Sequence, residues 1–352
     1  MNSVAHNIYI HVPFCASKCR YCAFFSNTCA APDWGAYSDS VCSELDYWSK
    51  RLGKVSVPTI FFGGGTPSLM PVAVFEKIMC RLSSCFALES NCEITLESNP
   101  GTLDIGRLKD FCLAGMNRLS VGVQRLDDVS LAFLGRRHSV RDARVLIDGA
   151  LSCGVRTSAD FIYGLPGDDV DVVKGICNQI NKIGLTHCSM YELTIEPGTP
   201  LARMSLDMPD NALMADMYMS IASSLSLPRY EVSNYSVPGQ ECRHNQNVWG
   251  GDAYIGIGRG GAGRVYLDGV WYDQMGAFQR FDSIDVVARS TEMLITGLRT
   301  VRGCLLTDDV KRVIDMDWVY SHPDLICMSG DCIFATVQGM MVLDDVILNV
   351  VR

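Results

Sequence analysis

Residues 9–24 read YIHVPFCASKCRYCAF and place Cys15, Cys19 and Cys22 with three and then two residues between them. The irons of a [4Fe–4S] cluster are normally held by cysteine thiolates. Three cysteines at this spacing hold three irons and leave the fourth open to chelate a small molecule. The stretch therefore predicts an open-iron [4Fe–4S] cluster, with the rest of the chain as its scaffold.

A structural zinc site is the alternative for the same stretch. Such a site needs four ligands, usually arranged as separated pairs. His11 lies four residues before the triplet and Cys29 seven after it, so either residue can complete a closed site.

Length and composition set the broad class. A chain of 352 residues exceeds the size of one typical core, which favours one large and one small domain. Sixteen cysteines at irregular spacing, many of them in apolar runs, fit the reduced thiols of a cytoplasmic protein.

No stretch approaches the roughly 20 apolar residues of a membrane span, and the N-terminus lacks a secretory pattern. At most peripheral membrane contact is expected, and the net charge of −9 argues against nucleic acid as a partner.

A pattern of short strand followed by longer helix recurs before Pro209. Alternation of this kind implies parallel βα units, in a partial barrel or a doubly wound sheet. The predicted strands are residues 7–12, 57–62, 92–98, 118–123, 155–163 and 187–193, and the predicted helices are residues 32–52, 71–86, 103–115, 126–134, 140–153 and 170–184.

Polar and glycine-rich motifs follow the predicted strands. Residues 63–67 read GGGTP, and Glu97, Gln124 and Asp160 come at or near later strand ends. In either architecture, ligands collect at the carboxyl ends of the strands. A glycine loop lets the backbone approach a ligand closely, although it also suits an ordinary tight turn. Isolated polar residues are common in loops, so only their position beside the cysteine loop makes them site candidates.

The regular alternation of predicted strands and helices stops after Pro209. A helix at 211–225 and a strand at 230–235 precede a glycine-rich segment, 238–264, which reads as a long functional loop. Within it, His244 and Trp249 offer an imidazole and a large flat ring, which suit an aromatic macrocycle carrying a metal. A hydrogen-bonded structural histidine and a core tryptophan are the alternative.

The C-terminal part has a separate pattern. A helix is expected over 282–301, and residues 304–352 mix short helices with strand-like sequence, as in a small winged-helix-like unit. The predicted domains are residues 1–235, a region at 236–280 packing on that core, and a small domain at 281–352, with the break near Phe278 to Asp282.

The ordered motifs resemble one family. They are similar to those of radical S-adenosylmethionine (SAM) proteins of the coproporphyrinogen III oxidase-like superfamily. The resemblance implies an α/β fold, a partial (β/α)6 radical-SAM barrel followed by a small C-terminal α+β winged-helix-like domain. The motifs that carry it are the cysteine stretch, GGGTPS at 63–68, ESNPG at 97–101, NRLSVGVQ at 117–124, LGRRH at 134–138 and DFIYGLPG at 160–167.

Two branches of this superfamily compete. The coproporphyrinogen III dehydrogenase branch typically carries a further cysteine two residues after the third ligand and a long N-terminal arm. Here Phe24 stands at that position, and fourteen residues precede Cys15. The HemW-type haem chaperone branch carries a His-Asn-x-x-Tyr-Trp segment, and residues 244–249 read HNQNVW. These features favour the chaperone branch, although Val248, Arg259 and Ala262 depart from the usual residues.

The resemblance implies cofactors and site residues position by position. The cysteine triplet holds the cluster, and its open iron takes the amino and carboxylate groups of SAM. Haem is the implied cargo, contacted by His244 and delivered to a haem-requiring acceptor protein; a homodimer is compatible with the resemblance. The residues implied to line the SAM site are Tyr9, Gly64, Gly65, Thr66, Glu97, Gln124, Arg136 and Asp160, with Thr194 as a weaker candidate.

Three function classes follow from these expectations. The first is a haem chaperone on a radical-SAM scaffold, without dehydrogenase turnover. The second is the oxygen-independent coproporphyrinogen III dehydrogenase, an oxidative decarboxylase. The third, a simple iron–sulfur electron carrier, predicts no binding of SAM.

Overall fold

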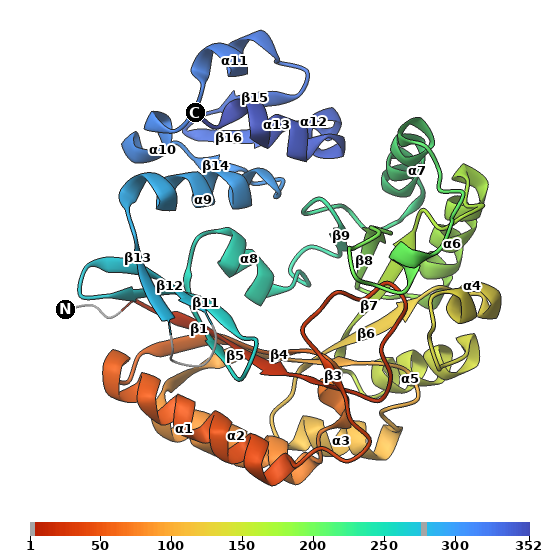
Figure 1. Ribbon diagram of the computed structural model, residues 1–352, viewed down its shortest axis with the longest axis vertical. Helices are drawn as coiled ribbons and strands as arrows, with labels where there is room; N and C mark the ends of the chain where they lie inside the picture. The colour runs from red at the N-terminus through yellow and green to blue at the C-terminus, as the bar shows by residue number, and fades with distance from the viewer. Residues whose placement is uncertain (1–3, 276–279) are drawn as a thin grey trace.

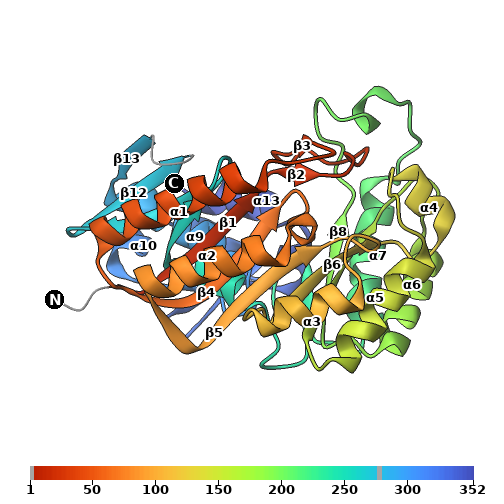
Figure 2. The same ribbon diagram turned by 90° about the horizontal axis from the view of Figure 1, so that it is seen from below.

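A single large sheet organises the computed structural model, which describes residues 4–275 and 280–352 (Figures 1 and 2). Its six central strands are parallel and lie side by side in chain order, so each βα unit adds to the same edge. That order is a barrel-type winding and excludes the doubly wound alternative. The strands are β1 (His6–Val12), β4 (Ser56–Gly64), β5 (Ala87–Ser98), β6 (Arg118–Gln124), β7 (Arg156–Tyr163) and β8 (His187–Glu192). The predicted partial (β/α)6 barrel is confirmed.

The helices that connect these strands cover the outer face of the sheet. Most begin at a side chain that caps the first backbone N–H groups, as Asp33 and Ser139 do. The last of them ends at Gly184, in the left-handed region with φ 77°. They are α1 (Trp34–Leu52), α2 (Val72–Cys85), α3 (Ile105–Leu113), α4 (Asp128–Phe133), α5 (Val140–Ser152) and α6 (Val170–Ile183).

The strands alternate between an apolar outer face and a polar inner face. Ile8, Ile10 and Val12 of β1 are fully buried in the core that the helices complete. Asn7, directly before Ile8 in sequence, points to the other face, where it accepts a hydrogen bond from Thr59 of β4 at 2.7 Å. Since both faces of a parallel sheet are covered, the inner face is also mostly buried. The half-barrel therefore encloses a polar interior.

Both edges of the parallel sheet are extended. Beyond β8, α7 (Asn211–Ser224) leads to the antiparallel strand β9 (Asn234–Ser236), so the strand predicted at 230–235 forms only at its end. Beyond β1, strand β10 (Ala253–Ile257) pairs in parallel, and the sheet continues through β11 (Ala262–Leu267), β12 (Val270–Met275) and β13 (Arg280–Ile284).

The long loop predicted at 238–264 is wrong. This segment forms α8 (Arg243–Trp249) and the strands β10 and β11. Its glycines serve close sheet packing rather than loop flexibility. The Gln274 side chain accepts a hydrogen bond from the Gly256 backbone N–H at 2.9 Å, and a Cβ atom on Gly263 would lie 2.4 Å from Gln274 Oε1.

The C-terminal unit has its own apolar core, which includes Leu294, Ile314, Ile333 and Val346. A three-stranded antiparallel sheet in the order β14-β16-β15 packs with short helices, which confirms the predicted small α+β unit. Of the predicted break at Phe278 to Asp282, residues 278 and 279 lie outside the described residues. The elements are α9 (Val286–Leu298), β14 (Cys304–Leu305), α10 (Asp308–Arg312), α11 (Met316–Ser321), β15 (Ile326–Ser329), β16 (Cys332–Ala335), α12 (Val337–Met341) and α13 (Leu343–Val350).

Among the helices of the described residues, a search for membrane spans finds no candidate with the necessary length and hydropathy.

Candidate functional site

The cysteine loop folds back on itself above the carboxyl ends of the parallel strands (Figure 2). Two short strands, β2 (Phe14–Cys15) and β3 (Asn27–Thr28), pair in parallel and close the loop. The Cys29 backbone N–H donates to the Cys15 carbonyl at 3.1 Å, and that of Cys22 donates to the Cys19 carbonyl at 3.3 Å. Backbone pairing thus holds all three cysteines of the triplet in one compact turn.

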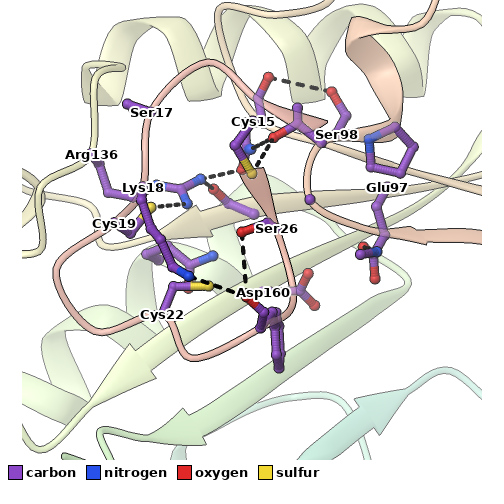
Figure 3. A pocket seen from close by; sticks show the side chains of 18 of the residues that line it. Cys15, Ser17, Lys18, Cys19, Cys22, Ser26, Glu97, Ser98, Arg136 and Asp160 are labelled. Carbon is purple, nitrogen blue, oxygen red and sulfur yellow. Dashed lines mark hydrogen bonds between the residues drawn. The ribbon is translucent and has the colours of Figure 1, made fainter. Parts of the chain in front are cut away.

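One pocket of about 140 Å³ lies between this loop and the strand ends (Figure 3). The structure brings together ten of the twelve predicted site residues on its walls; Tyr9 and His244 are the exceptions. The ten are Cys15, Cys19, Cys22, Gly64, Gly65, Thr66, Glu97, Gln124, Arg136 and Asp160.

The thiols face hydrogen-bond donors, and burial together with the other two thiols raises the pKa of Cys22. The Arg136 guanidinium donates to Cys19 Sγ at 3.3 Å, and the Thr66 hydroxyl donates to Cys15 Sγ at 3.7 Å. Donors at these positions stabilise negative charge on sulfur. The chemistry of the wall therefore fits a cluster held by thiolates.

A zinc site would need a fourth ligand, and the His11 side chain makes other contacts instead. Its Nδ1 lies 3.0 Å from the Tyr9 hydroxyl and its Nε2 lies 2.8 Å from the Phe25 carbonyl oxygen, so both ring nitrogens are engaged. Across residues 4–275 and 280–352, no three His, Cys, Asp or Glu side chains are grouped closely enough to hold a single metal ion.

The glycine loop packs directly beneath the cysteine loop. The Gly65 N–H donates to the Val12 carbonyl at 2.8 Å, and a Cβ atom on Gly65 would lie 2.6 Å from the Phe14 carbonyl oxygen. Gly64 adopts φ 113° and donates its N–H to Glu97 Oε2 at 3.1 Å. Only glycine permits the conformation at Gly64 and the close approach at Gly65, so the site's geometry requires glycine at both positions.

Gln124 is held in a strained conformation at the end of β6. Its φ of 68° lies in the left-handed region, and the register between β6 and β7 shifts between Gly122 and Gln124. Non-glycine residues in this region cost of order 1 kcal/mol or more and cluster at functional sites. The shift aims the Gln124 side chain into the pocket.

Two carboxyl groups share the floor of the pocket. Burial, and then the nearby Asp160, raise the pKa of Glu97 to about 8. Burial also raises the pKa of Asp160, although hydrogen bonds from Ser189 at 2.7 Å and Ser120 at 3.2 Å favour its charged form. Perturbed carboxyl groups in a pocket mark a functional site, and both can accept hydrogen bonds from a ligand's hydroxyl or ammonium groups.

Arg136 connects several parts of the site through hydrogen bonds. Besides Cys19, its guanidinium donates to the Gly122 carbonyl at 2.6 Å, to Asn99 Oδ1 and to the Tyr21 hydroxyl at 3.5 Å. It therefore ties the cysteine loop to the ends of β5 and β6.

Sequence reasoning did not assign several residues that line the pocket to the site, among them Tyr21, Asn99 and Ser120. Ser120 lies four residues before Gln124 on the same strand, so the two-residue period of a strand was a signal for it. Asn99 follows Glu97 by two residues and donates to the Thr66 hydroxyl at 2.9 Å. Tyr21 gave no signal beyond its place in the cysteine loop.

A second, more apolar cavity of about 320 Å³ adjoins the first and shares Tyr21, Cys22, Phe24, Gln124 and Asp160 with it. Thr194, the weaker candidate, lines this second cavity. The remaining walls come from Ala23, Ile162, Tyr191, Glu192, Leu193 and Glu196. The cysteine site thus opens toward a space suited to an apolar ligand.

Tyr9 lies just behind the pocket rather than on its wall. Its ring stacks on Phe61 with centroids 6.2 Å apart, and burial and the charge of Glu97 raise its pKa. Phe61 in turn contacts the His244 ring at 5.2 Å. Tyr9 and Phe61 therefore link the pocket to α8.

His244 lies deep inside the half-barrel, with 5% of its surface exposed. Its Nδ1 is 2.8 Å from Thr59 Oγ1, and its backbone N–H donates to Glu93 Oε1 at 3.1 Å. Burial lowers its pKa to about 4, so the imidazole is neutral at pH 7. The structure does not bring His244 together with the other predicted residues.

Comparisons with known proteins agree with this geometry. The family model of the Radical SAM superfamily matches residues 9–180. The Heme chaperone HemW of Escherichia coli strain K12 is 34% identical over 264 residues, 74% of this chain and 70% of that protein. The Heme chaperone HemW of Lactococcus lactis is 32% identical over 86% of this chain and 83% of that protein. The solved structure of coproporphyrinogen III oxidase (HemN) from Escherichia coli superposes with a TM-score of 0.83 and 17% identity, over 99% of this chain and 90% of that one. This last likeness concerns the fold.

Proposed function

The chain belongs to the radical SAM superfamily and, within it, to the HemW family, and on that basis we propose that it binds haem and delivers it to a haem-requiring apoprotein. The superfamily implies a [4Fe–4S] cluster and SAM as cofactors. The observation that carries the choice of chaperone over dehydrogenase is Phe24, which is 70% exposed beside the cluster loop where the enzyme branch has a cysteine.

The residues proposed to hold the cofactors are those of the pocket. Cys15, Cys19 and Cys22 would hold the cluster, which supplies one-electron chemistry to SAM through its open iron when bound. The Gly64 and Gly65 backbone groups suit the methionyl end of SAM, and the carboxyl groups suit its hydroxyl and ammonium groups. Replacement of any one of these cysteines by Ala should abolish the absorbance of a reconstituted cluster. Cys80→Ala, at an exposed position of α2, should leave it intact.

His244 is proposed to contact haem iron, and its hydrogen bonding supports this role. The Thr59 hydroxyl donates its proton to Asn7, so it accepts the hydrogen bond from Nδ1 of His244. This leaves the Nε2 lone pair of His244 without a hydrogen-bond partner among the described residues. A histidine that ligates a metal typically donates its other ring N–H in this way. Because the side chain is buried, iron reaches it only after α8 shifts.

Haem titration of the purified protein tests both proposals. The wild type should bind haem, and His244→Ala should lose affinity and change the Soret spectrum. Thr59→Val removes only the hydroxyl that fixes the tautomer, and we expect a smaller loss, about 10-fold. If His244→Ala binds as tightly as the wild type with the same spectrum, His244 is not a ligand. If the wild type binds no haem, the chaperone function itself fails.

The dehydrogenase remains the second candidate because an apolar cavity adjoins the cluster pocket and contains Asp160. An anaerobic assay with coproporphyrinogen III, SAM and a reductant should show no protoporphyrinogen IX. Formation of that product would reverse the assignment.

We also propose a reducing, cytoplasmic location, a small α+β domain at residues 281–352, and a homodimer as the state to test by sedimentation. The location is supported by the sixteen cysteines, all of which have free thiols.

A further inference from the structure

A cleft of about 440 Å³ separates the barrel from the C-terminal unit, away from the cluster pocket. We call it the methionine cleft. Its barrel side comes from the ends of β7 and β8 and from α7, and its other side from α12 and the start of α13 (Figure 1). The lining residues that matter below are Met190, Met214, Met340, Met341, Glu192, Asp344, Asp345, Tyr218 and Arg299.

Four methionines supply the apolar walls. Met190 and Met340 are buried, whereas Met214 and Met341 are partly exposed to the cleft. Gly164, at φ 81°, makes room for Met214, since a Cβ atom there would lie 2.6 Å from Met214 Cε. Methionine side chains are flexible and polarisable, and surfaces rich in them accommodate the apolar side chains of varied partners.

The rim of the cleft is acidic and lacks compensating cations. Glu192, Asp344 and Asp345 are exposed, and none of them forms an ion pair within the described residues. Burial and the charge of Asp344 raise the pKa of Glu192. Arg299, the basic residue in the lining, is already bound to the buried Glu231 at 3.3 Å. The rim therefore presents unpaired negative charge beside apolar walls.

Apolar walls beside an acidic rim disfavour an anionic ligand and favour a cationic amphipathic one. Haem carries two propionate carboxylates, which the rim would repel. An amphipathic segment with lysine or arginine on one face complements both features, because its apolar side chains meet the methionines while its cations meet the carboxylates. The buried Tyr218 hydroxyl, which has no hydrogen-bond partner among the described residues, offers a further polar contact.

We propose that the methionine cleft docks an amphipathic, positively charged segment of a partner protein. Only the identification of that partner as the haem acceptor rests on the proposed chaperone function. The docking chemistry involves neither the cluster pocket nor His244.

Two synthetic peptides of about 18 residues, five helical turns, provide the probe. One has leucines on one face and lysines on the other, and the second has glutamate in place of each lysine. We expect fluorescence anisotropy to show binding of the lysine peptide to the full chain, weakened by salt. The glutamate peptide should not bind.

The variant Asp344→Lys with Asp345→Lys should weaken binding of the lysine peptide by ~10-fold or more, because two attractions become repulsions. Asp308→Lys with Asp309→Lys is the matched control, since these carboxylates begin α10 just as Asp344 and Asp345 begin α13. Equal loss in both double variants, or equal binding of both peptides, would overturn the proposal.

Haem titration of the same variants separates this inference from the proposed function. The Asp344 and Asp345 variant should bind haem as the wild type does. If it loses haem affinity while the wild type ignores the lysine peptide, the cleft is a haem site and the docking proposal is wrong. Circular dichroism of both variants checks that the fold is retained.

Discussion

Glu97 carries the clearest pH-dependent property of the pocket. Its pKa of about 8 in the folded protein lies above the ordinary value near 4.5, because burial and Asp160 disfavour its charge. The folded state therefore binds a proton more tightly than the unfolded chain. The free energy of unfolding falls as pH rises from about 4.5 through 8, since the buried group must then ionise.

The variant Glu97→Gln removes this cost and should raise the melting temperature of the cofactor-free protein at pH 8 to 9. We expect a gain of at least ~1 kcal/mol, or roughly 2 °C, and no difference near pH 4.5. Glu89→Gln, at a half-exposed position of the same strand, serves as the control. A difference that is constant with pH would show that Glu97 is not the titrating group.

Backbone strain at Gln124 gives a second test at this scale. Gln124→Gly should relieve the left-handed conformation and stabilise the protein by ~1 kcal/mol, while weakening SAM binding through loss of the amide. Asp268, at φ 50° in the turn between β11 and β12, is the matched control. Asp268→Gly should stabilise the protein without changing SAM affinity in a calorimetric titration, and a parallel loss of affinity would argue against a ligand role for Gln124.

The sequence alone located most of the pocket because strand ends, glycine loops and cysteine spacing are local signals. Arg136 shows the limit of such signals. The resemblance implied it only as one residue of the SAM site, whereas the structure shows its guanidinium in contact with Cys19, Gly122 and Asn99. Partners far apart in sequence are fixed by packing, which no local pattern records.

At the scale of elements, α8 depends on a single buried carboxylate. Glu93 of β5 accepts hydrogen bonds from Arg156 at 3.0 Å and from the backbone N–H groups of Arg243 and His244 at 3.3 and 3.1 Å. These N–H groups belong to the first turn of the helix, where they have no helical partners. Glu93 thus fixes where α8 begins inside the half-barrel.

Glu93→Ala should destabilise the protein by about 3–5 kcal/mol, because it leaves Arg156 and the helix terminus without their partner. Glu89→Ala, which breaks a partly exposed contact to Arg243, should cost less than ~1 kcal/mol. Urea unfolding measures both. Similar costs for the two variants would mean that α8 is held by apolar contacts instead.

Helices and strands with a regular pattern of apolar residues were predictable from the sequence. Strands whose glycines allow close packing against neighbouring backbone were not. The six parallel strands and their helices follow the apolar and glycine pattern of the sequence. Strand β10 did not, because Gly256 interrupts its apolar run and Gly258 follows directly after its last residue. The reason for these glycines is visible only in the sheet, where the Ala262 backbone beside Gly256 and the His11 backbone beside Gly258 occupy the space that a side chain would need.

At the scale of the whole molecule, the winding of the sheet separates the cluster pocket from His244. The carboxyl ends of the strands hold the cluster pocket, whereas α8 fills the interior nearer their amino ends, against Thr59 and Glu93. Motif spacing could not reveal this separation, because it is produced by β10 pairing beside β1 after more than two hundred intervening residues. The cluster and His244 are thus linked through Tyr9 and Phe61 rather than by contact.

Cofactor binding should stabilise the whole chain against unfolding. A ligand that binds only the folded state adds about 2.7 kcal/mol at a concentration 100 times its dissociation constant, or roughly 4 °C in melting temperature for a chain of this size. The reconstituted protein should therefore melt at higher temperature as SAM is added. Cys19→Ala, which removes one proposed cluster ligand, should show no such shift, because the proposed open iron would anchor the amino and carboxylate groups of SAM. An equal shift in this variant would show that the glycine loop and carboxyl groups bind SAM without the cluster, and would remove the cluster from the binding step.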